Sequence, residues 1–147
     1  MRDMLNNKQV VHLGNVVLSG TTPAASSWVD LKGFDACSIL VVSNTITDAG
    51  TASGFTATLQ EGDDSTAVGA TAVAAADAVN GTVTVTEVTD GDDNTISGGV
   101  GYKGSKRYVR VNVVGTTATD ADVSVIAVLN KPHRAATTLA GTAVAAT

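Results

Sequence analysis

Apolar and polar residues alternate along much of this chain with a period of two, the pattern of a β-strand with one buried face. The alternation is clearest in residues 55–60, 82–86, 108–113 and 123–129. Residues 36–42 are apolar at every position except Ser38, so we expect a central strand covered on both faces. Residues 10–18 supply one or two further strands.

Clusters of Gly, Asn and Asp separate these segments, and such residues tolerate the left-handed backbone of tight turns. The clusters lie at residues 47–50, 61–64, 80–81, 90–93 and 98–99. Seven or eight short strands joined in this way predict an all-β fold, an antiparallel β-sandwich of jelly-roll type. Residues 67–79, which mix Ala with Val and Thr, predict one short helical turn at most.

The two ends of the chain differ from its middle. We expect residues 1–8 to form a polar, flexible N-terminal arm, residues 9–134 the sandwich domain, and residues 135–147 an uncharged Ala/Thr-rich tail. The tail has too little to bury to fold alone, so it is either flexible or ordered on a neighbour.

Small side chains dominate the composition, since Ala, Val, Thr and Gly account for 80 of the 147 residues and only five residues are aromatic. Each methylene missing from a core forgoes about 0.8 kcal/mol of burial. A core of Val and Ala is therefore thin, and we expect neighbouring copies to contribute stability by self-association.

Charge is distributed unevenly, because residues 33–102 contain no Lys, Arg or His but ten Asp or Glu. The net charge of −5 argues against binding nucleic acid, whose phosphates attract basic proteins. Residues 1–20 lack the apolar run of a secretory signal, and no apolar run is long enough to span a membrane. We therefore expect a protein made in a cytoplasm, with no membrane partner.

Residues 99–104, Gly-Val-Gly-Tyr-Lys-Gly, match the letters of a dinucleotide-binding fingerprint. That motif needs a helix after it to hold the pyrophosphate, whereas residues 107–113 resemble a strand. A glycine-rich loop is the better interpretation, and we predict no cofactor.

Asp90, Asp92 and Asn94 have the spacing of the first ligands in a calcium-binding loop, but Thr95 and Gly101 replace the required Gly and Glu. A weak calcium site that adds Asp63 or Asp64 is the alternative to a solvated turn, and we predict no metal.

Catalytic chemistry has few candidates. Cys37 is the only cysteine and lies in an apolar strand, so we expect it to be buried and inert. His12 and His133 are too few for a zinc site and lie in no hydrolase signature. We therefore expect no enzyme activity.

One concentrated positive patch remains, formed by Lys103, Lys106, Arg107 and Arg110. It is either a solvated strand face or a contact with an acidic neighbour, and charge complementarity of that kind sets register and partner choice. That neighbour would be an adjacent copy or another protein, and Tyr102 lies next to the patch in the same segment.

Several segments, taken in order, resemble the capsid decoration, or cement, proteins of tailed phages. The most specific is residues 101–111, Gly-Tyr-Lys-Gly-Ser-Lys-Arg-Tyr-Val-Arg-Val; looser similarities are found at residues 28–35, 45–50, 59–65, 73–77, 123–129 and 132–134. The resemblance spans about residues 20–135, and the family has no catalytic motif to carry over.

The resemblance implies a non-enzymatic virion protein, trimeric, that binds the major capsid protein on the outer surface of the head and stabilises contacts between its subunits. Our candidates for subunit or capsid contacts are then Tyr102, Lys103, Lys106, Arg107 and Arg110. Two alternatives stay open: a structural protein of the tail or of the base of a head fibre, and a carbohydrate- or calcium-binding β-module.

Overall fold

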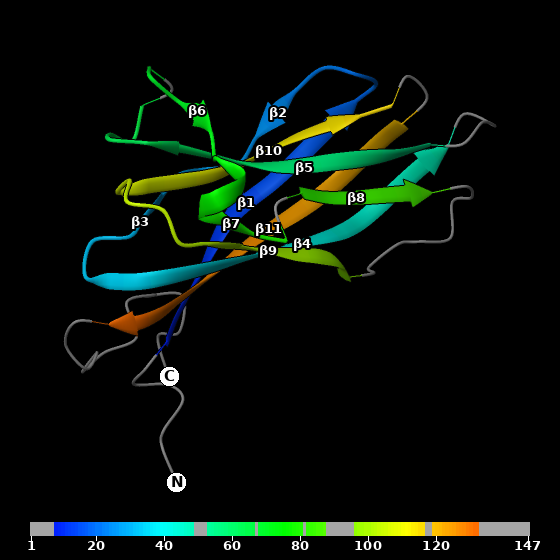
Figure 1. Ribbon diagram of the computed structural model, residues 1–147. Helices are drawn as coiled ribbons and strands as arrows, with labels where there is room; N and C mark the ends of the chain where they lie inside the picture. Colours follow the sequence, from blue (N-terminus) through cyan, green and yellow to red (C-terminus); the bar gives the residue numbers. More distant parts are fainter. Residues whose placement is uncertain are drawn as a thin grey trace, which may run out of the picture.

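Figure 1 shows the computed structural model, which describes residues 8–48, 53–66, 68–80, 82–87, 96–116 and 119–132. Lys8 already belongs to the first strand. The rest of the predicted N-terminal arm and the whole C-terminal tail lie outside the described residues, as do Asp90, Asp92 and His133.

The described chain is almost entirely β-structure. Its longer strands are β1 (Lys8–Ser19), β4 (Phe34–Asp48), β5 (Ser53–Gly62), β8 (Thr82–Glu87), β9 (Ile96–Tyr102), β10 (Tyr108–Gly115) and β11 (Thr119–Pro132). Four two-residue strands complete the set: β2 (Ala24–Ala25), β3 (Val29–Asp30), β6 (Thr71–Ala72) and β7 (Ala78–Val79). One 3₁₀ turn, η1 (Ala75–Asp77), is the short helical turn predicted for residues 67–79.

The strands form two antiparallel sheets. Sheet A has the order β1-β11-β4-β9-β7. In sheet B the order is β2-β10-β5-β6, with β3 also paired to β10 and β8 also paired to β5. The predicted antiparallel sandwich is confirmed (Figure 1), while the jelly-roll type stays a prediction. No helix in the described part of the chain is long and apolar enough to cross a membrane.

The core lies between the sheets and consists of the inward residues of each alternating strand. β10 shows this most regularly, since Val109, Val111 and Val113 are fully buried and the residues between them are partly exposed. Opposite them lie Val123, Val125 and Ala127 of β11, also fully buried. Phe55 of β5 is the largest fully buried side chain, so the core is indeed built from small residues.

Polar side-chain contacts join the sheets at each end of the sandwich. At one end, Thr119 of β11 is fully buried, and its Oγ1 accepts from the Gly54 N–H and donates to the Gly54 carbonyl, both at 2.9 Å. At the other end, the Tyr102 hydroxyl of β9 donates to Glu61 Oε2 of β5 at 2.7 Å. Polar groups buried in this way hold the sheets in one alignment, because any shift would leave them unpaired.

Two predictions about strands need correction. Residues 36–42 do lie in a central strand, β4, but Leu40 and Val42 are partly exposed, so only the inner face is fully covered. Gly98 and Gly99, predicted as a turn, and Gly101, predicted in a glycine-rich loop, lie within β9. A Cβ at Gly99 would meet Leu40 Cδ2 at 3.1 Å, and one at Gly101 would meet Val79 Cβ at 3.1 Å, so neighbouring side chains occupy that space.

Candidate functional site

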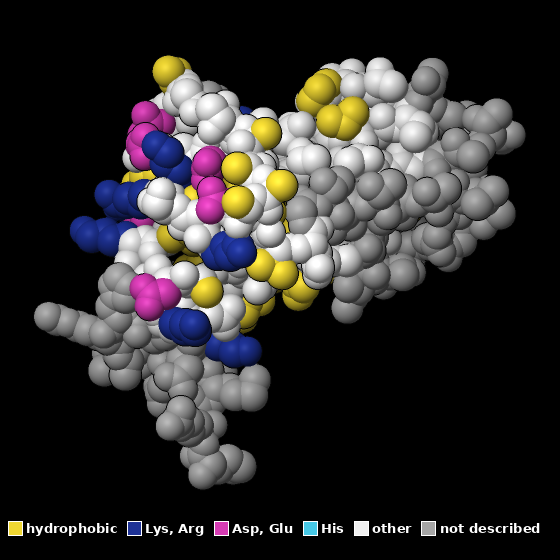
Figure 2. Space-filling model, viewed as in Figure 1, with side chains coloured by type: hydrophobic (Ala, Val, Ile, Leu, Met, Phe, Trp, Pro, Cys, Tyr) yellow, Lys and Arg dark blue, Asp and Glu magenta, His cyan; other side chains and the backbone are white. Residues whose placement is uncertain are grey.

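The predicted contact residues gather at one end of the sandwich, where the turn after β9 leads into β10. Figure 2 shows Lys and Arg side chains collected over this end and interleaved with Asp and Glu. The segment from Lys103 to Arg107 lies beside the turn between β3 and β4, because the Leu31 N–H donates to the Arg107 carbonyl at 2.8 Å. We call Tyr102, Lys103, Lys106, Arg107 and Arg110, together with Lys32, the charged end.

Tyr102 is a buried anchor beneath this surface, since only 3% of the residue is exposed. Its hydroxyl accepts a hydrogen bond from the Lys106 N–H at 2.8 Å while it donates to Glu61. Burial, and then the hydrogen bond to Glu61, raise the pKa of Tyr102 well above its usual value. A Cβ at Gly104 would lie 2.5 Å from the Tyr102 hydroxyl oxygen, so the ring fits only beneath a glycine.

Two of the basic side chains form ion pairs within the chain. Lys106 Nζ lies 2.7 Å from Asp63 Oδ2. Arg107 binds Asp30 in a bidentate arrangement, with Nη2 and Nε at 2.6 and 2.9 Å from the two carboxylate oxygens. The hydrogen bonds raise the pKa values of Lys106 and Arg107 and lower that of Asp30. An acidic neighbour was predicted for this patch, and the acids that meet it come from the same chain.

Arg110 is held by other contacts. Its guanidinium carbon lies 4.5 Å from the centroid of the Trp28 ring, and its Nε donates to Gln60 Oε1 at 2.8 Å. A cation over an aromatic face is attracted by the ring quadrupole, so Trp28 and Gln60 fix the direction of the guanidinium. Arg107 similarly lies 4.9 Å from the Tyr108 ring centroid.

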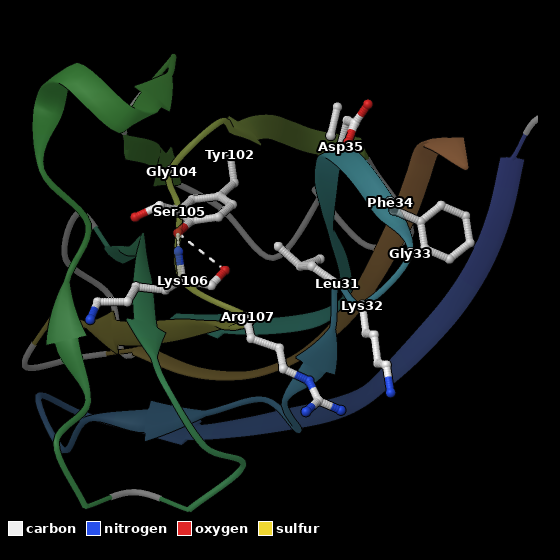
Figure 3. A pocket seen from close by; sticks show the side chains of 11 residues that line it. Leu31, Lys32, Gly33, Phe34, Asp35, Tyr102, Gly104, Ser105, Lys106 and Arg107 are labelled. Carbon is white, nitrogen blue, oxygen red and sulfur yellow. Dashed lines mark hydrogen bonds between the residues drawn. The ribbon is translucent and has the colours of Figure 1, made fainter. Parts of the chain in front are cut away.

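Lys32 and Lys103 are the uncommitted cations of the charged end. Both are exposed, and neither has a carboxylate within salt-bridge distance among the described residues. Lys32 borders a surface pocket of about 520 Å³ that is also lined by Leu31, Tyr102 and Arg107. Figure 3 shows Leu31 in the middle of this pocket, with the Tyr102 ring on one side and the Lys32 and Arg107 side chains on another. The pocket offers a partner a small apolar floor and a cationic rim.

The structure brings the predicted basic residues together at one end of the sandwich, but the sequence missed what holds them. Asp30, Trp28, Gln60 and Glu61 were not predicted as members of the site. Their only local signal is that they lie in two segments that carry the family resemblance, residues 28–35 and 59–65. The positions of Asp30, Gln60 and Glu61 opposite β10 depend on the strand register.

The other candidate groups that the structure describes do not assemble into a site, while Asp90, Asp92 and His133 lie outside the described residues. Within the described residues no cluster of three or more His, Cys, Asp or Glu could hold a metal. Asp63 is paired with Lys106, and Asp64 accepts hydrogen bonds from the N–H and hydroxyl of Thr66 at 2.8 and 2.6 Å. Cys37 is buried as predicted, and burial raises the pKa of its thiol to about 12.

Replacing Asp30 with Asn is expected to lower the free energy of unfolding by about 0.2–1 kcal/mol at pH 7, because the pair with Arg107 is half-exposed. The pKa of Asp30 is lowered in the folded protein, so its contribution is complete above the unfolded value of about 3.9 and is lost as the pH falls through the folded value. Urea unfolding of both proteins from pH 7 to pH 2 checks this. A difference in stability that grows on acidification would contradict it.

Comparisons with known proteins give a fold likeness and no family. No family model matches the chain, and no curated protein is detectably similar in sequence. The structure resembles the PBSX exported protein XepA with a TM-score of 0.52 and 14% identity, over 94% of this chain and 42% of that one. This chain thus spans less than half the length of that protein.

A second likeness is to Bacillus endospore appendages, described as a novel family of disulfide-linked pili. The TM-score is 0.40 and the identity 17%, over 90% of this chain and 96% of that one. At these identities the first likeness supports the β-sandwich fold alone, and the second adds no argument.

Proposed function

We propose that this protein is a non-enzymatic structural component of a phage particle, which attaches to the outer surface of the head and bridges neighbouring subunits of the major capsid protein. The proposal starts from the resemblance to decoration proteins carried by residues 101–111. That segment contains the turn and strand that display the charged end.

The observation that carries the proposal is the rigid support beneath the charged end. Tyr102 ties the turn to both sheets, and Asp30, Asp63 and Trp28 each fix one cation. Holding side chains in place before binding reduces the entropy lost when a complex forms. A protein that binds many identical sites on a shell benefits from such a prepared surface.

Lys32 and Lys103 supply the specific attraction in this proposal. Both are exposed and have no ion-pair partner among the described residues, so they are available to carboxylates on a capsid subunit. The pairs already formed by Lys106 and Arg107 set the local geometry. Such surface charges govern the rate and register of docking more than its total affinity.

Self-association is part of the proposal as well, since the resemblance implies a trimer and the core contains few large side chains. Contacts between neighbouring copies would then add stability that a single core of small residues does not supply.

Binding of purified protein to undecorated heads tests the proposal. The double variant Lys32→Glu/Lys103→Glu is expected to bind at least about tenfold more weakly, with a lower association rate and a flatter salt dependence. Thr22→Glu, which adds a charge in the exposed segment after β1 at the other end of the sandwich, is the control and should bind like the wild type.

Two results would contradict the proposal: no measurable binding of the wild-type protein to heads, or equal binding by the double variant and the control. A melting curve for each variant shows that the substitutions leave the fold intact.

A further inference from the structure

The outer faces of the two sheets differ in chemistry. On sheet B the outward residues of β5 and β10 include Thr56, Thr58, Gln60, Arg110 and Asn112, with Val114 as an apolar exception. On sheet A the outward positions include Val10, Val17, Leu40, Val79, Ile126 and Val128, which lie among polar residues such as His12, Asn15, Ser38 and Ser124. A solvated sheet face normally alternates to polar residues, so sheet A carries more large apolar residues on its outer face than solvation requires.

The exposure of this outer face is high. Val10, Val17 and Val79 are 59%, 73% and 50% exposed, and the other exposed large apolar residue of the described chain, Val68, lies in the turn between β5 and β6. The register places Val10 beside Val128, and Ile126 beside Leu40 in the next row, so these four residues form an apolar patch. Val17 lies beside Asp122 and is a second exposed apolar position on the same face. Patches of this kind mark interaction surfaces.

We propose that the outer face of sheet A binds the same face of a second copy of this chain, around a two-fold axis that lies in the interface and crosses the strands. An isologous contact of this type needs a patch that is complementary to itself after a half-turn. The arrangement of residues along β1 meets that requirement.

The half-turn reverses the strands and exchanges the two ends of β1. Its centre is the irregularity in register between His12 and Asn15. Val10 and Val17 lie on either side of this centre and exchange places. Val10 of one copy therefore meets Val17 of the other copy.

The charges at the two ends of the face also exchange. Lys8 begins β1 at one end, and at the other end Ser19 is paired with Asp120 of β11. Both Lys8 and Asp120 are exposed, so the half-turn brings each lysine of the pair toward the acidic end of its partner. Asp122 lies at the same end, and its Oδ1 is the buried side-chain oxygen that lacks a hydrogen-bond partner in the described part of the chain. A two-fold axis parallel to the strands would leave the two ends of each strand in place. The lysine end of one copy would then face the lysine end of the other.

Three polar residues within the face, Asn15, Asn44 and Ser124, are already paired with one another. Ser124 Oγ donates to Asn15 Oδ1 at 2.9 Å, and Asn44 Nδ2 donates to Ser124 Oγ at 2.8 Å. Groups whose hydrogen bonds are satisfied lose little when water is removed. The network therefore does not oppose burial of the face.

The area is sufficient for a stable pair. Twelve residues of β1 rise about 3.3 Å each, and four strands lie about 4.8 Å apart, which gives a face on the order of 700 Å² per copy. Stable protein interfaces bury about 800 Å² per partner, and packed sheets align within about 30°.

This contact is distinct from the trimer implied by the resemblance, which needs two different patches in contact around a ring. The two arrangements combine in a closed particle with an even number of copies, and the smallest such particle has six. An even number of copies is therefore the signature of the proposed face.

Sedimentation equilibrium at about 100 µM measures that number. The wild-type chain is expected to contain two copies, or six if a trimer also forms, and Val17→Glu is expected to reduce the number to one or three. Val68→Glu is the matched control, because it places the same charge at an 82%-exposed valine outside the face and should leave the mass unchanged. Melting curves confirm that both variants are folded.

Charge reversal then tests the orientation of the two copies. Lys8→Glu alone and Asp120→Lys alone are each expected to weaken the pair by about tenfold, and the double variant Lys8→Glu/Asp120→Lys to restore it. A wild-type mass of one or three copies, an equal response to Val17→Glu and Val68→Glu, or a double variant as weak as the singles would overturn the proposal.

Discussion

Replacing Tyr102 with alanine is expected to lower the free energy of unfolding by about 3–5 kcal/mol, the range seen when a buried aromatic side chain is removed. The ring packs in the core with 3% exposure and fills the space beneath Gly104. Its hydroxyl also holds Glu61 of the other sheet and the N–H of Lys106. Urea unfolding followed by circular dichroism measures the loss.

Tyr102→Phe separates the hydroxyl from the ring. The loss is expected to be about 1–2 kcal/mol, because one hydrogen bond to a carboxylate and one to a backbone N–H disappear while the packing remains. If the phenylalanine variant were as unstable as the alanine variant, the ring would contribute nothing, and the anchoring role given to its burial would be wrong.

Thr119→Val is expected to cost about 1–3 kcal/mol, although valine has nearly the same shape as threonine. Thr119 is fully buried, and the substitution removes both hydrogen bonds between its Oγ1 and the backbone of Gly54. The Gly54 N–H would then lose its partner in a buried place. Thermal and urea unfolding measure the change.

Two control substitutions support this measurement. Thr119→Ser retains the hydroxyl and should lose only about 1 kcal/mol for the missing methyl group. Thr45→Val makes the same chemical change at an exposed position of β4 and should stay within about 0.5 kcal/mol of the wild type. A valine variant at Thr119 that is as stable as the wild type would show that the contact between the sheets adds no stability.

The strands were predictable wherever the alternation of residues was regular. Residues 108–113 and 123–129 lie in β10 and β11 because their valines point to one side and form the core. β9 was missed because Gly98, Gly99 and Gly101 resemble a turn in sequence. They fit a strand only because Leu40 and Val79, from distant segments, occupy the space above them, which no local pattern reveals.

The charged end was predictable in part for the same reason. Lys103, Lys106 and Arg107 follow one another along the chain, so their proximity is visible in the sequence. Asp30 and Glu61 meet them through the registers of β3 and β5 against β10, which pair Asp30 with Tyr108 and Glu61 with Val109. Such long-range register is fixed by the assembled sheet.

The sequence of β4 predicts more coverage than the single chain provides. Residues 36–42 are apolar on both sides, which is typical of a strand buried on both faces. In the single chain only one face is covered, and Leu40 and Val42 remain partly exposed. The expectation of full coverage is met only if another molecule covers sheet A, as the proposed pairing of two copies requires.

The measurement that tests the central claim most directly is the number of copies of this chain in the purified particle whose genome encodes it, by quantitative mass spectrometry against the major capsid protein. A head-stabilising protein is predicted to be present at a number comparable to that of the capsid subunits. A handful of copies per particle, or none, would contradict a role as a decoration protein.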